Sequence, residues 1–226
     1  MNTVPRISVI IPALNAEAVL PAAIAAVREG DVEIIVVDGG SGDGTVTGAR
    51  QAGAKVIVSD KGRGQQLRRG GEEAAGDWLL FLHADTRLQA GWRAAAAAFI
   101  ANPANETRAA VFTYALDDSS PQARRIERLV GWRTRVLGLP YGDQGLLISR
   151  GHYDRLGGFR AMQLMEDVDL VRRVGKPNLT VLGTRAVTSA TRYRRGGWWA
   201  RPLRNLLCLT LYYLRVPPSI LLWIYR

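Results

Sequence analysis

A chain of 226 residues, 47% of them hydrophobic and 22% charged, can bury one sizeable core, and this composition excludes an intrinsically disordered protein. The single cysteine, Cys208, excludes an internal disulfide and fits a reducing compartment. The net charge of +10 belongs to the last quarter of the chain. Residues 1–169 hold 19 Lys or Arg against 20 Asp or Glu, whereas residues 170–226 hold 11 Lys or Arg and no acid. Such a segment indicates an anionic partner: nucleic acid, a phosphorylated ligand or an acidic membrane surface.

Strand and helix patterns alternate over the first part of the chain. Runs of β-branched and other apolar residues predict strands at residues 7–14, 33–40, 54–60 and 77–82. Helical spacing predicts the intervening helices at residues 17–29, 44–53 and 64–76. Strands this uniformly apolar must be covered on both faces, which is typical of a parallel sheet with crossover helices. Ligands of such sheets bind beyond the C-terminal strand ends, where several polar or turn-forming residues fall: Pro12, Asn15, Asp38, Asp60 and Asp85.

The rest of the chain has a less regular pattern. It predicts helices at residues 93–99, 121–138 and 165–175 and strands at residues 109–116 and 145–150. No stretch rich in Gly, Pro or Ser divides the chain. We therefore expect one α/β domain over residues 1–195 and a basic, apolar helical tail over residues 196–226, which is part of that domain or faces a membrane or partner. The N-terminal apolar run is too short for an export signal, so a cytoplasmic protein is expected.

The stretch VVDGGSGDGT, residues 36–45, places Asp38 at a strand end before a Gly/Ser turn and a helix. The backbone amides of such a turn favour an anion, and a strand-end carboxylate suits hydrogen bonds from a base or ribose. The alternative is a helix-capping turn, formed by Asp43 and Thr45, that binds nothing. The pattern favours the cap for Asp43 and ligand binding for Asp38.

Other charged positions also have competing interpretations. Arg63, which lies between two glycines, can reach a phosphate bidentately or belong to a solvated loop. Asp85, in the stretch HADT, is a metal ligand or a helix cap. Glu166 and Asp167, in the stretch MEDVDL, are catalytic acids or acids favoured by the dipole at a helix start.

In their order along the chain, these segments resemble family 2 glycosyltransferases of GT-A fold. SVIIPALNAE is similar to their first strand, EIIVVDGGSGDGT to their nucleotide-binding strand and turn, and LLFLHADT to the strand with their metal motif. GDQGLLISRGHYDRLGGF is similar to their acceptor-side strand and helix, MEDVDL to their acidic pair, and SATRY to their last motif. The resemblance covers residues 7–195. VVDGGS, HADT, PYGDQG and LMEDV also resemble a subgroup found near radical-SAM and selenium-related genes, the arsenosugar-type transferases.

The resemblance implies an α/β fold with a mostly parallel central sheet flanked by helices. It also implies inverting transfer of a hexosyl group from a nucleotide-diphosphate sugar to an acceptor hydroxyl. For the donor, it implies contacts from Pro12, Asn15 and Asp38, charge from Arg63 and Arg192, and Mg²⁺ or Mn²⁺ held by Asp85. For the transfer itself, it implies that Asp167 is the base, that Glu166 orients it, and that Asp143 and Gln144 contact acceptor or sugar.

The chain departs from the family pattern in three motifs. His83 replaces the first aspartate of the metal motif, so it either binds Mn²⁺, contacts the ribose or is structural. Gly39 replaces the second aspartate of the nucleotide-binding motif, which leaves base recognition to Asp38. In the last motif, Ser189 and Tyr193 replace Gln and Trp, and Arg192 remains.

A competing interpretation is a non-catalytic nucleotide-fold module that binds an anionic membrane or nucleic acid. Nucleic acid is not expected, because the chain has no recognised reading motif and its tail is more apolar than a phosphate-binding surface needs. A dinucleotide oxidoreductase is not expected either, because no G-x-G-x-x-G motif opens the first helix of this chain. Residues 198–226 are too interrupted by Arg and Pro to span a bilayer, and they predict a helix lying at an anionic membrane interface. The alternative is that this tail packs on its own domain or on a second subunit in a homodimer.

Overall fold

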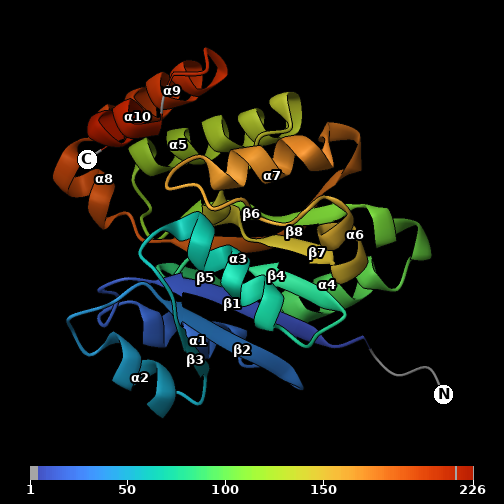
Figure 1. Ribbon diagram of the computed structural model, residues 1–226. Coiled ribbons are helices and arrows are strands. Elements are labelled where there is room, and N and C mark those ends of the chain that lie inside the picture. Colours follow the sequence, from blue (N-terminus) through green and yellow to red (C-terminus); the bar gives the residue numbers. More distant parts are fainter. Residues whose placement is uncertain (1–4, 217, 226) are drawn as a thin grey trace.

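The computed structural model describes residues 5–216 and 218–225, and their strands join in one sheet (Figure 1). The order across this sheet is β3-β2-β1-β4-β7-β6-β8-β5. The strands are β1 (Ile7–Ala13), β2 (Val32–Asp38), β3 (Lys55–Val58), β4 (Trp78–Phe81), β5 (Thr86–Leu88), β6 (Ala109–Leu116), β7 (Leu146–Ser149) and β8 (Leu179–Thr188). The α-helices are α1 (Leu20–Val27), α2 (Thr45–Gln51), α3 (Arg63–Glu73), α4 (Trp92–Ile100), α5 (Pro121–Trp132), α6 (Arg150–Arg155), α7 (Glu166–Val174), α8 (Thr191–Gly196), α9 (Ala200–Tyr213) and α10 (Pro218–Tyr225).

The four N-terminal strands run parallel, as the sequence predicts. Side chains of β1 alternate between two cores, because Val9 and Ile11 join the core on one face of the sheet and Ile10 joins the core on the other. Helices α1, α2 and α4 pack on the first face, and helices α3, α6 and α7 pack on the second. Both faces are thus covered, which is why the central strands are apolar along their whole length.

Strand β7 joins the two halves of the sheet. It pairs antiparallel with β4 on one side and with β6 on the other. The register places Phe81, the last residue of β4, opposite Leu146, the first residue of β7. The turn that follows β4 and the turn that precedes β7 therefore meet at the same edge of the sheet. Beyond β7, strands β6 and β8 are parallel, and the short β5 pairs antiparallel with β8.

Some elements differ from the sequence-based expectations. The helix expected at residues 121–138 is α5 followed by a π-helical turn, η2 (Arg133–Leu137), and the left-handed Gly138 (φ 65°) ends it. Strands β5 and β8 were not expected from local patterns, because β5 has three residues and β8 is interrupted by Gly183 and an exposed Arg185.

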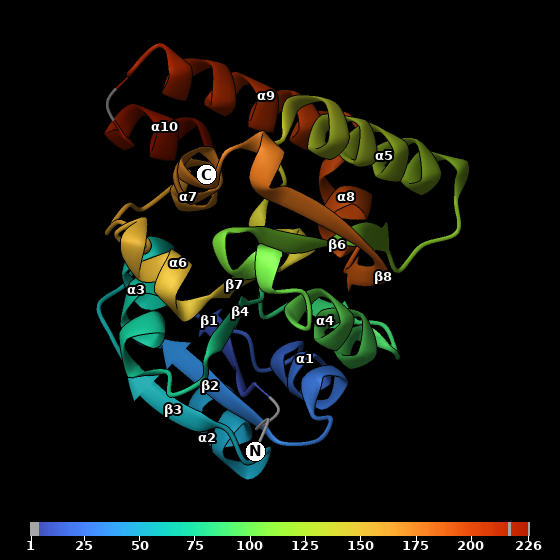
Figure 2. The same cartoon turned by 90° about the vertical axis from the view of Figure 1, so that its right-hand side faces the viewer.

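The C-terminal tail forms two helices, α9 and α10, instead of one. Their inner faces, including Cys208 and Leu221, pack with Met165 and Val168 at the start of α7. Figures 1 and 2 show both helices on the side of the sheet that α7 covers. The tail therefore packs on its own domain with one face, as one of the two expectations states. Within the described residues, no helix has the length and apolar content needed to cross a membrane.

Helix α3 fixes the C-terminal ends of β1 and β2 through one buried side chain. The Gln66 amide nitrogen donates hydrogen bonds of 2.8 Å to the carbonyl oxygens of both Ala13 and Val37, and the residue is 4% exposed. This amide ties two strand ends to one helix.

We expect Gln66→Ala to lower the free energy of unfolding by about 2–3 kcal/mol, because two buried hydrogen bonds are lost together. Urea denaturation followed by circular dichroism measures this change. The matched control is Gln65→Ala on the same helix, at a partly exposed position, and it should cost less than about 0.5 kcal/mol. Equal losses in the two variants would contradict this role of Gln66.

Candidate functional site

A cleft of about 940 Å³ opens at the C-terminal ends of β1 and β4. The loop after β1, the start of α3 and the turn after β4 form most of its wall. Several residues that the sequence predicts to bind a donor or its metal line this cleft together: Pro12, Asn15, Arg63, His83 and Asp85. The cleft also contains residues that the sequence reasoning missed: Lys61, Gln163 and Leu222.

Two loops form a hydrogen-bonded unit beside the cleft. Asn15 has a left-handed backbone (φ 48°), a conformation that asparagine tolerates better than most residues. Its backbone N–H donates to the Ser41 hydroxyl (2.8 Å), and its side-chain oxygen accepts from the Gly42 N–H (2.9 Å). The two loops thus hold each other in place, so a ligand at Asn15 would meet a preformed wall.

Asp38 is buried at the end of β2, with 2% exposure. One of its carboxylate oxygens accepts the backbone N–H groups of Gly40 and Ser41, each at 3.0 Å, so this residue shapes its own turn. Its contact with a nucleoside stays a prediction. Asp43 accepts the Thr45 N–H at 3.0 Å at the start of α2, as the capping interpretation predicts, and the Thr45 hydroxyl helps to lower the pKa of Asp43.

The structure gives a steric reason for Gly39, where the family motif has an aspartate. A Cβ atom at this position would lie 3.0 Å from the amide nitrogen of Gln66, the side chain that joins β1 and β2. The amide thus occupies the space next to Gly39. A side chain at residue 39 would press against that amide, which would have to shift by a few tenths of an ångström.

The acidic pair lies at the start of α7, after Met165, whose backbone is left-handed (φ 65°). Glu166 is 1% exposed, and its Oε1 lies 3.4 Å from Nη1 of Arg63, a residue of the cleft wall. Its Oε2 is buried and has no hydrogen-bond partner among the described residues. Burial raises the pKa of the Glu166 carboxyl to about 7, Arg63 opposes the shift, and the charge of Asp167 adds to it.

Asp167 lies on the other side of the same helix start and faces the turn before β7. Its Oδ2 accepts the Gly142 N–H at 2.8 Å, and it borders a small hollow together with Arg63, Tyr141 and Asn205. The two carboxylates of the pair therefore have different environments. Glu166 is enclosed, whereas Asp167 lies at a surface that joins α7 to the β7 side of the sheet.

His83 lies between the cleft and the acidic pair. It belongs to the wall of the large cleft and also to a narrow space that Asp167 and Gly142 border. A Cβ atom at residue 142 would lie 2.4 Å from Nε2 of His83, so only glycine leaves room for this ring. His83 is thus packed against the turn that holds Asp167.

Asp169, the third acid of the stretch, has a structural environment. It is 6% exposed, and its oxygens accept from Nη1 of Arg160 (2.9 Å) and Nε of Arg173 (3.0 Å). The ion pair of Asp169 with Arg173 joins residues one helical turn apart. Arg172 instead lies over the Tyr213 ring, 4.7 Å from its centroid.

The structure does not bring the Gln144 amide into the cleft. The residue is 1% exposed, its nitrogen donates to the Phe112 carbonyl (3.1 Å), and its oxygen accepts from the Thr134 hydroxyl (2.8 Å). Both ends of the amide thus serve the fold, which argues against a direct contact with sugar or acceptor. Asp143 lies on the same turn, next to Gly142, and its role stays a prediction.

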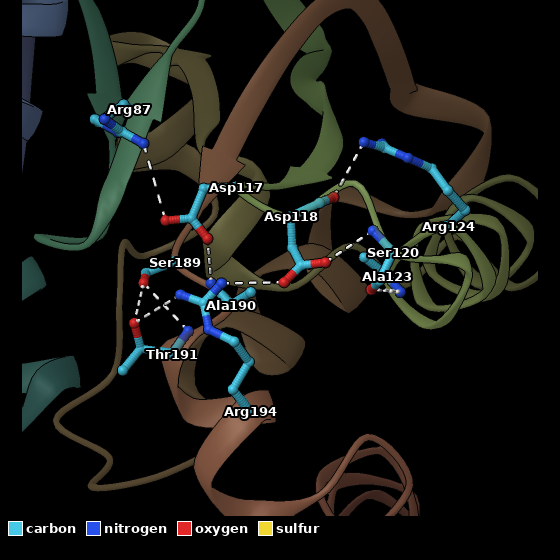
Figure 3. A network of polar contacts seen from close by, with 10 residues as sticks. All are labelled: Arg87, Asp117, Asp118, Ser120, Ala123, Arg124, Ser189, Ala190, Thr191 and Arg194. Atoms are coloured by element: carbon cyan, nitrogen blue, oxygen red, sulfur yellow. Dashed lines mark hydrogen bonds and ion pairs between the residues drawn. The ribbon is translucent and has the colours of Figure 1, made fainter.

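The side chain of Arg192 lies outside the described residues, but the helix that carries it, α8, is anchored firmly (Figure 3). Asp117 accepts the Ala190 N–H at 2.6 Å and lies 4.0 Å from Arg87. Asp118 accepts from Nη1 of Arg194 at 3.0 Å. This network ties the start of α8 to the end of β6.

The chemistry of the cleft wall fits a cation only together with a phosphate ligand. Among the described residues, no group of three or more His, Cys, Asp or Glu side chains could hold a metal ion. Asp85 and His83 are the acidic or imidazole side chains of the wall. Mg²⁺ at nucleotide sites is typically held by one or two carboxylates plus phosphate oxygens and waters, so this partial set fits a metal that binds with a diphosphate.

The family model described as Glycosyl transferase family 2 matches residues 8–163. The chain belongs to this family. Curated relatives called "PGL/p-HBAD biosynthesis glycosyltransferase", from Mycobacterium bovis and Mycobacterium tuberculosis, are 42% identical over 107 residues. That match spans 42% of this chain and 42% of theirs, which is less than half the length of these relatives.

Solved structures confirm the predicted α/β fold of GT-A type for this family 2 member. The mannosyltransferase from Pyrobaculum calidifontis, in complex with GDP-Man and Mn²⁺, has a TM-score of 0.67 and 19% identity, over 99% of this chain and 69% of that one. Glucosyl-3-phosphoglycerate synthase from Mycobacterium tuberculosis, in complex with Mn²⁺, uridine diphosphate and glucosyl-3-phosphoglycerate, has a TM-score of 0.60 and 20% identity, over 94% and 81% of the two chains.

We expect Glu166→Gln to change how stability depends on pH. In the folded protein the pKa of Glu166 is about 7, against an ordinary value of 4.5 for a glutamate side chain. Stability from this group is therefore present at low pH and is lost as pH rises from about 4.5 to about 7, by roughly 3 kcal/mol. Glutamine does not titrate, so the variant should not show this loss.

Free energies of unfolding from urea denaturation at several pH values between 5 and 8 measure the effect. The free energy of unfolding of the variant should increase relative to that of the wild type as pH rises. Glu72→Gln is the control, because Glu72 lies in an exposed pair on α3 and its side chain is 47% exposed. A pH-independent difference for Glu166→Gln would show that its carboxyl titrates normally.

Proposed function

We propose that this chain transfers a sugar from a nucleotide-diphosphate donor to an acceptor hydroxyl. The observation that carries the proposal is the shared arginine: Arg63 borders the large cleft and contacts the buried Glu166. A donor in the cleft and a base at the start of α7 would thus lie next to each other. A non-catalytic module has no need for a carboxylate buried at such a cost.

The donor would lie in the cleft at the ends of β1 and β4. The loop with Pro12 and Asn15 supports the nucleoside, and Arg63 adds positive charge near the phosphates. Asp85 holds a divalent cation, Mg²⁺ or Mn²⁺, together with the diphosphate. When bound, that cation neutralises the negative charge of the leaving group. Two solved structures of similar fold contain Mn²⁺ with a nucleotide or a nucleotide sugar, which supports a site of this kind.

Asp167 would take the proton from the acceptor hydroxyl. A single positioned carboxylate suffices for this step, because a direct displacement with inversion needs one base and no protein nucleophile. The Gly142 N–H holds one oxygen of Asp167, which orients the carboxylate. The enclosed Glu166 positions Arg63 and adds negative charge next to the base.

The finer assignments extend this proposal. Inversion and a hexosyl donor rest on the family resemblance of the MEDVDL segment. The arsenosugar-type subgroup rests on the motifs VVDGGS, HADT, PYGDQG and LMEDV alone. A panel of nucleoside diphosphates in thermal-shift measurements, with and without Mg²⁺ or Mn²⁺, identifies the nucleotide that the cleft prefers.

We expect Asp85→Ala to abolish the gain in nucleotide affinity that Mn²⁺ gives, because the variant loses the carboxylate that shares the cation with the diphosphate. Isothermal titration calorimetry with and without Mn²⁺ measures this gain, and Mn²⁺ alone should bind weakly. Asp60→Ala is the control, since Asp60 is exposed after β3 and does not line the cleft. Wild-type metal dependence in Asp85→Ala would place the metal elsewhere.

We expect Asp167→Asn to lower turnover by roughly 10²- to 10⁴-fold, because asparagine keeps the shape of the side chain but cannot accept the proton. Nucleotide affinity should stay within about twofold of wild type, since the base acts on the acceptor. Asp169→Asn is the matched control, because it breaks two ion pairs of a buried carboxylate and should cost stability, about 3 kcal/mol, more than rate. Near-normal turnover of Asp167→Asn with an authentic acceptor would make Asp143 the next candidate.

A further inference from the structure

Helix α5 carries an exposed stripe that combines arginine with large apolar side chains. Arg125, Leu129 and Trp132 of α5 and Val136 of the following turn η2 recur at helical spacing, and all four are exposed. Trp132 is 53% exposed. The opposite side of the same helix, with Ala123, Ile126 and Val130, is fully packed against the domain. The helix therefore turns a second apolar face to solvent that its own core does not use.

Helix α9 carries a longer stripe with the same property. Large apolar residues repeat along one side at spacings of three, four and seven and are all exposed: Trp199, Leu203, Leu206, Leu207, Tyr213 and Leu214. Leu203 is 63% exposed, and Trp223 on the neighbouring α10 is 81% exposed. Single exposed leucines need no explanation, but a contiguous set of this size marks an interaction surface.

Both stripes lie in the same outer layer of the molecule. Figures 1 and 2 show α5, α9 and α10 together on the side of the sheet that α7 also covers. Tyr193 and Trp198, on the segment between β8 and α9, join the inner face of α5 in one hydrophobic cluster. The ion pair between Asp118 and Arg194 holds α8 near the start of α5 (Figure 3). The layer is thus fixed to the domain as one unit.

The border of this layer is positively charged. Residues 121–137 contain five arginines and one acid, and residues 191–225, which include α8, α9 and α10, contain six arginines and no acid. Beside the α5 stripe, a hollow of about 250 Å³ is bordered by the exposed Arg128, Arg135 and Arg185. Apolar stripes flanked by arginine and tryptophan have the composition of a surface that lies in the headgroup region of an anionic bilayer.

We propose that the exposed faces of α5, α9 and α10 bind the surface of an anionic lipid bilayer, with the leucine and tryptophan side chains entering the acyl boundary and the arginines contacting lipid phosphates. A second copy of the chain fits this surface less well, because a two-fold interface would bring the same arginine-rich patches together. Nucleic acid would leave the apolar stripes in water.

The surface adjoins the cleft, which gives it a consequence for the reaction. Leu222 of α10 lines the cleft, and Asn205 of α9 borders the hollow next to Asp167. A bilayer bound on the outer faces of these helices would present acceptor hydroxyl groups of membrane amphiphiles close to the base. This consequence rests on the proposed function, whereas the binding surface itself does not.

Co-sedimentation with vesicles tests the surface. The full chain should bind vesicles of equal parts phosphatidylcholine and phosphatidylglycerol at low salt, and weaken at high salt. Leu203→Glu combined with Leu206→Glu should lower this binding by about tenfold or more, because two apolar anchors become anions. The control is Val58→Glu on the edge strand β3, a site with similar exposure (67%), which should bind like wild type.

A second comparison tests the charge. The double variant Arg128→Gln/Arg135→Gln removes two arginines beside the α5 stripe, and the double variant Arg6→Gln/Arg50→Gln removes two exposed arginines at the distant end of the molecule. Only the first should weaken binding to anionic vesicles. All variants should bind nucleoside diphosphates like wild type, so that failure of the surface and failure of the proposed function are distinguishable. Absent binding to anionic vesicles, equal binding to pure phosphatidylcholine, or a dimer that Leu203→Glu/Leu206→Glu dissociates would each overturn the proposal.

Discussion

The antiparallel pairing of β4 with β7 is the constraint on which the rest of the site depends. Because Phe81 pairs with Leu146, the turn after one strand must meet the turn before the other. His83 enters from the first turn and occupies the space where residue 142 would otherwise have a side chain. The N–H of Gly142 then remains accessible to Asp167. A single register thus connects the parallel half of the sheet, with its cleft, to the helix that carries the acidic pair.

The contact between Arg63 and Glu166 adds a second connection, and it has an energetic cost. A carboxylate that is 1% exposed loses its hydration, and one arginine that is itself 35% exposed compensates only in part. The pKa of Glu166, raised to about 7, expresses this imbalance. Residues that serve the fold alone, such as Asp169 with its two arginine partners, are better compensated. The poorly compensated carboxylate of Glu166 is therefore a stronger argument for function than the well-compensated carboxylate of Asp169.

The sequence predicts the parallel strands and the cleft residues for one physical reason: buried strands are apolar throughout, so a polar residue at a strand end, such as Asn15 or Asp85, stands out. Gln144 shows the limit of this reasoning, because a buried amide that serves the fold has the same local pattern as one that binds a ligand. Asn205 and Leu222 reach the site from helices distant in the sequence, and their neighbours give no local signal. Only the tertiary packing of the tail reveals them.

That packing also bears on the expected boundary near residue 195. The inner faces of α9 and α10 complete a hydrophobic cluster with Leu139, Leu164 and Val168, and the last two of these lie on either side of the acidic pair in the sequence. The tail therefore packs against the segments that carry the acidic pair, and this role accounts for the apolar residues of its inner face only. A helix needed for support alone would place polar side chains on its other face, as α3 does with its exposed arginines and glutamates. The outer leucines of α9 have no such explanation within one chain, and their exposure is the reason for proposing a partner surface on this side of the molecule.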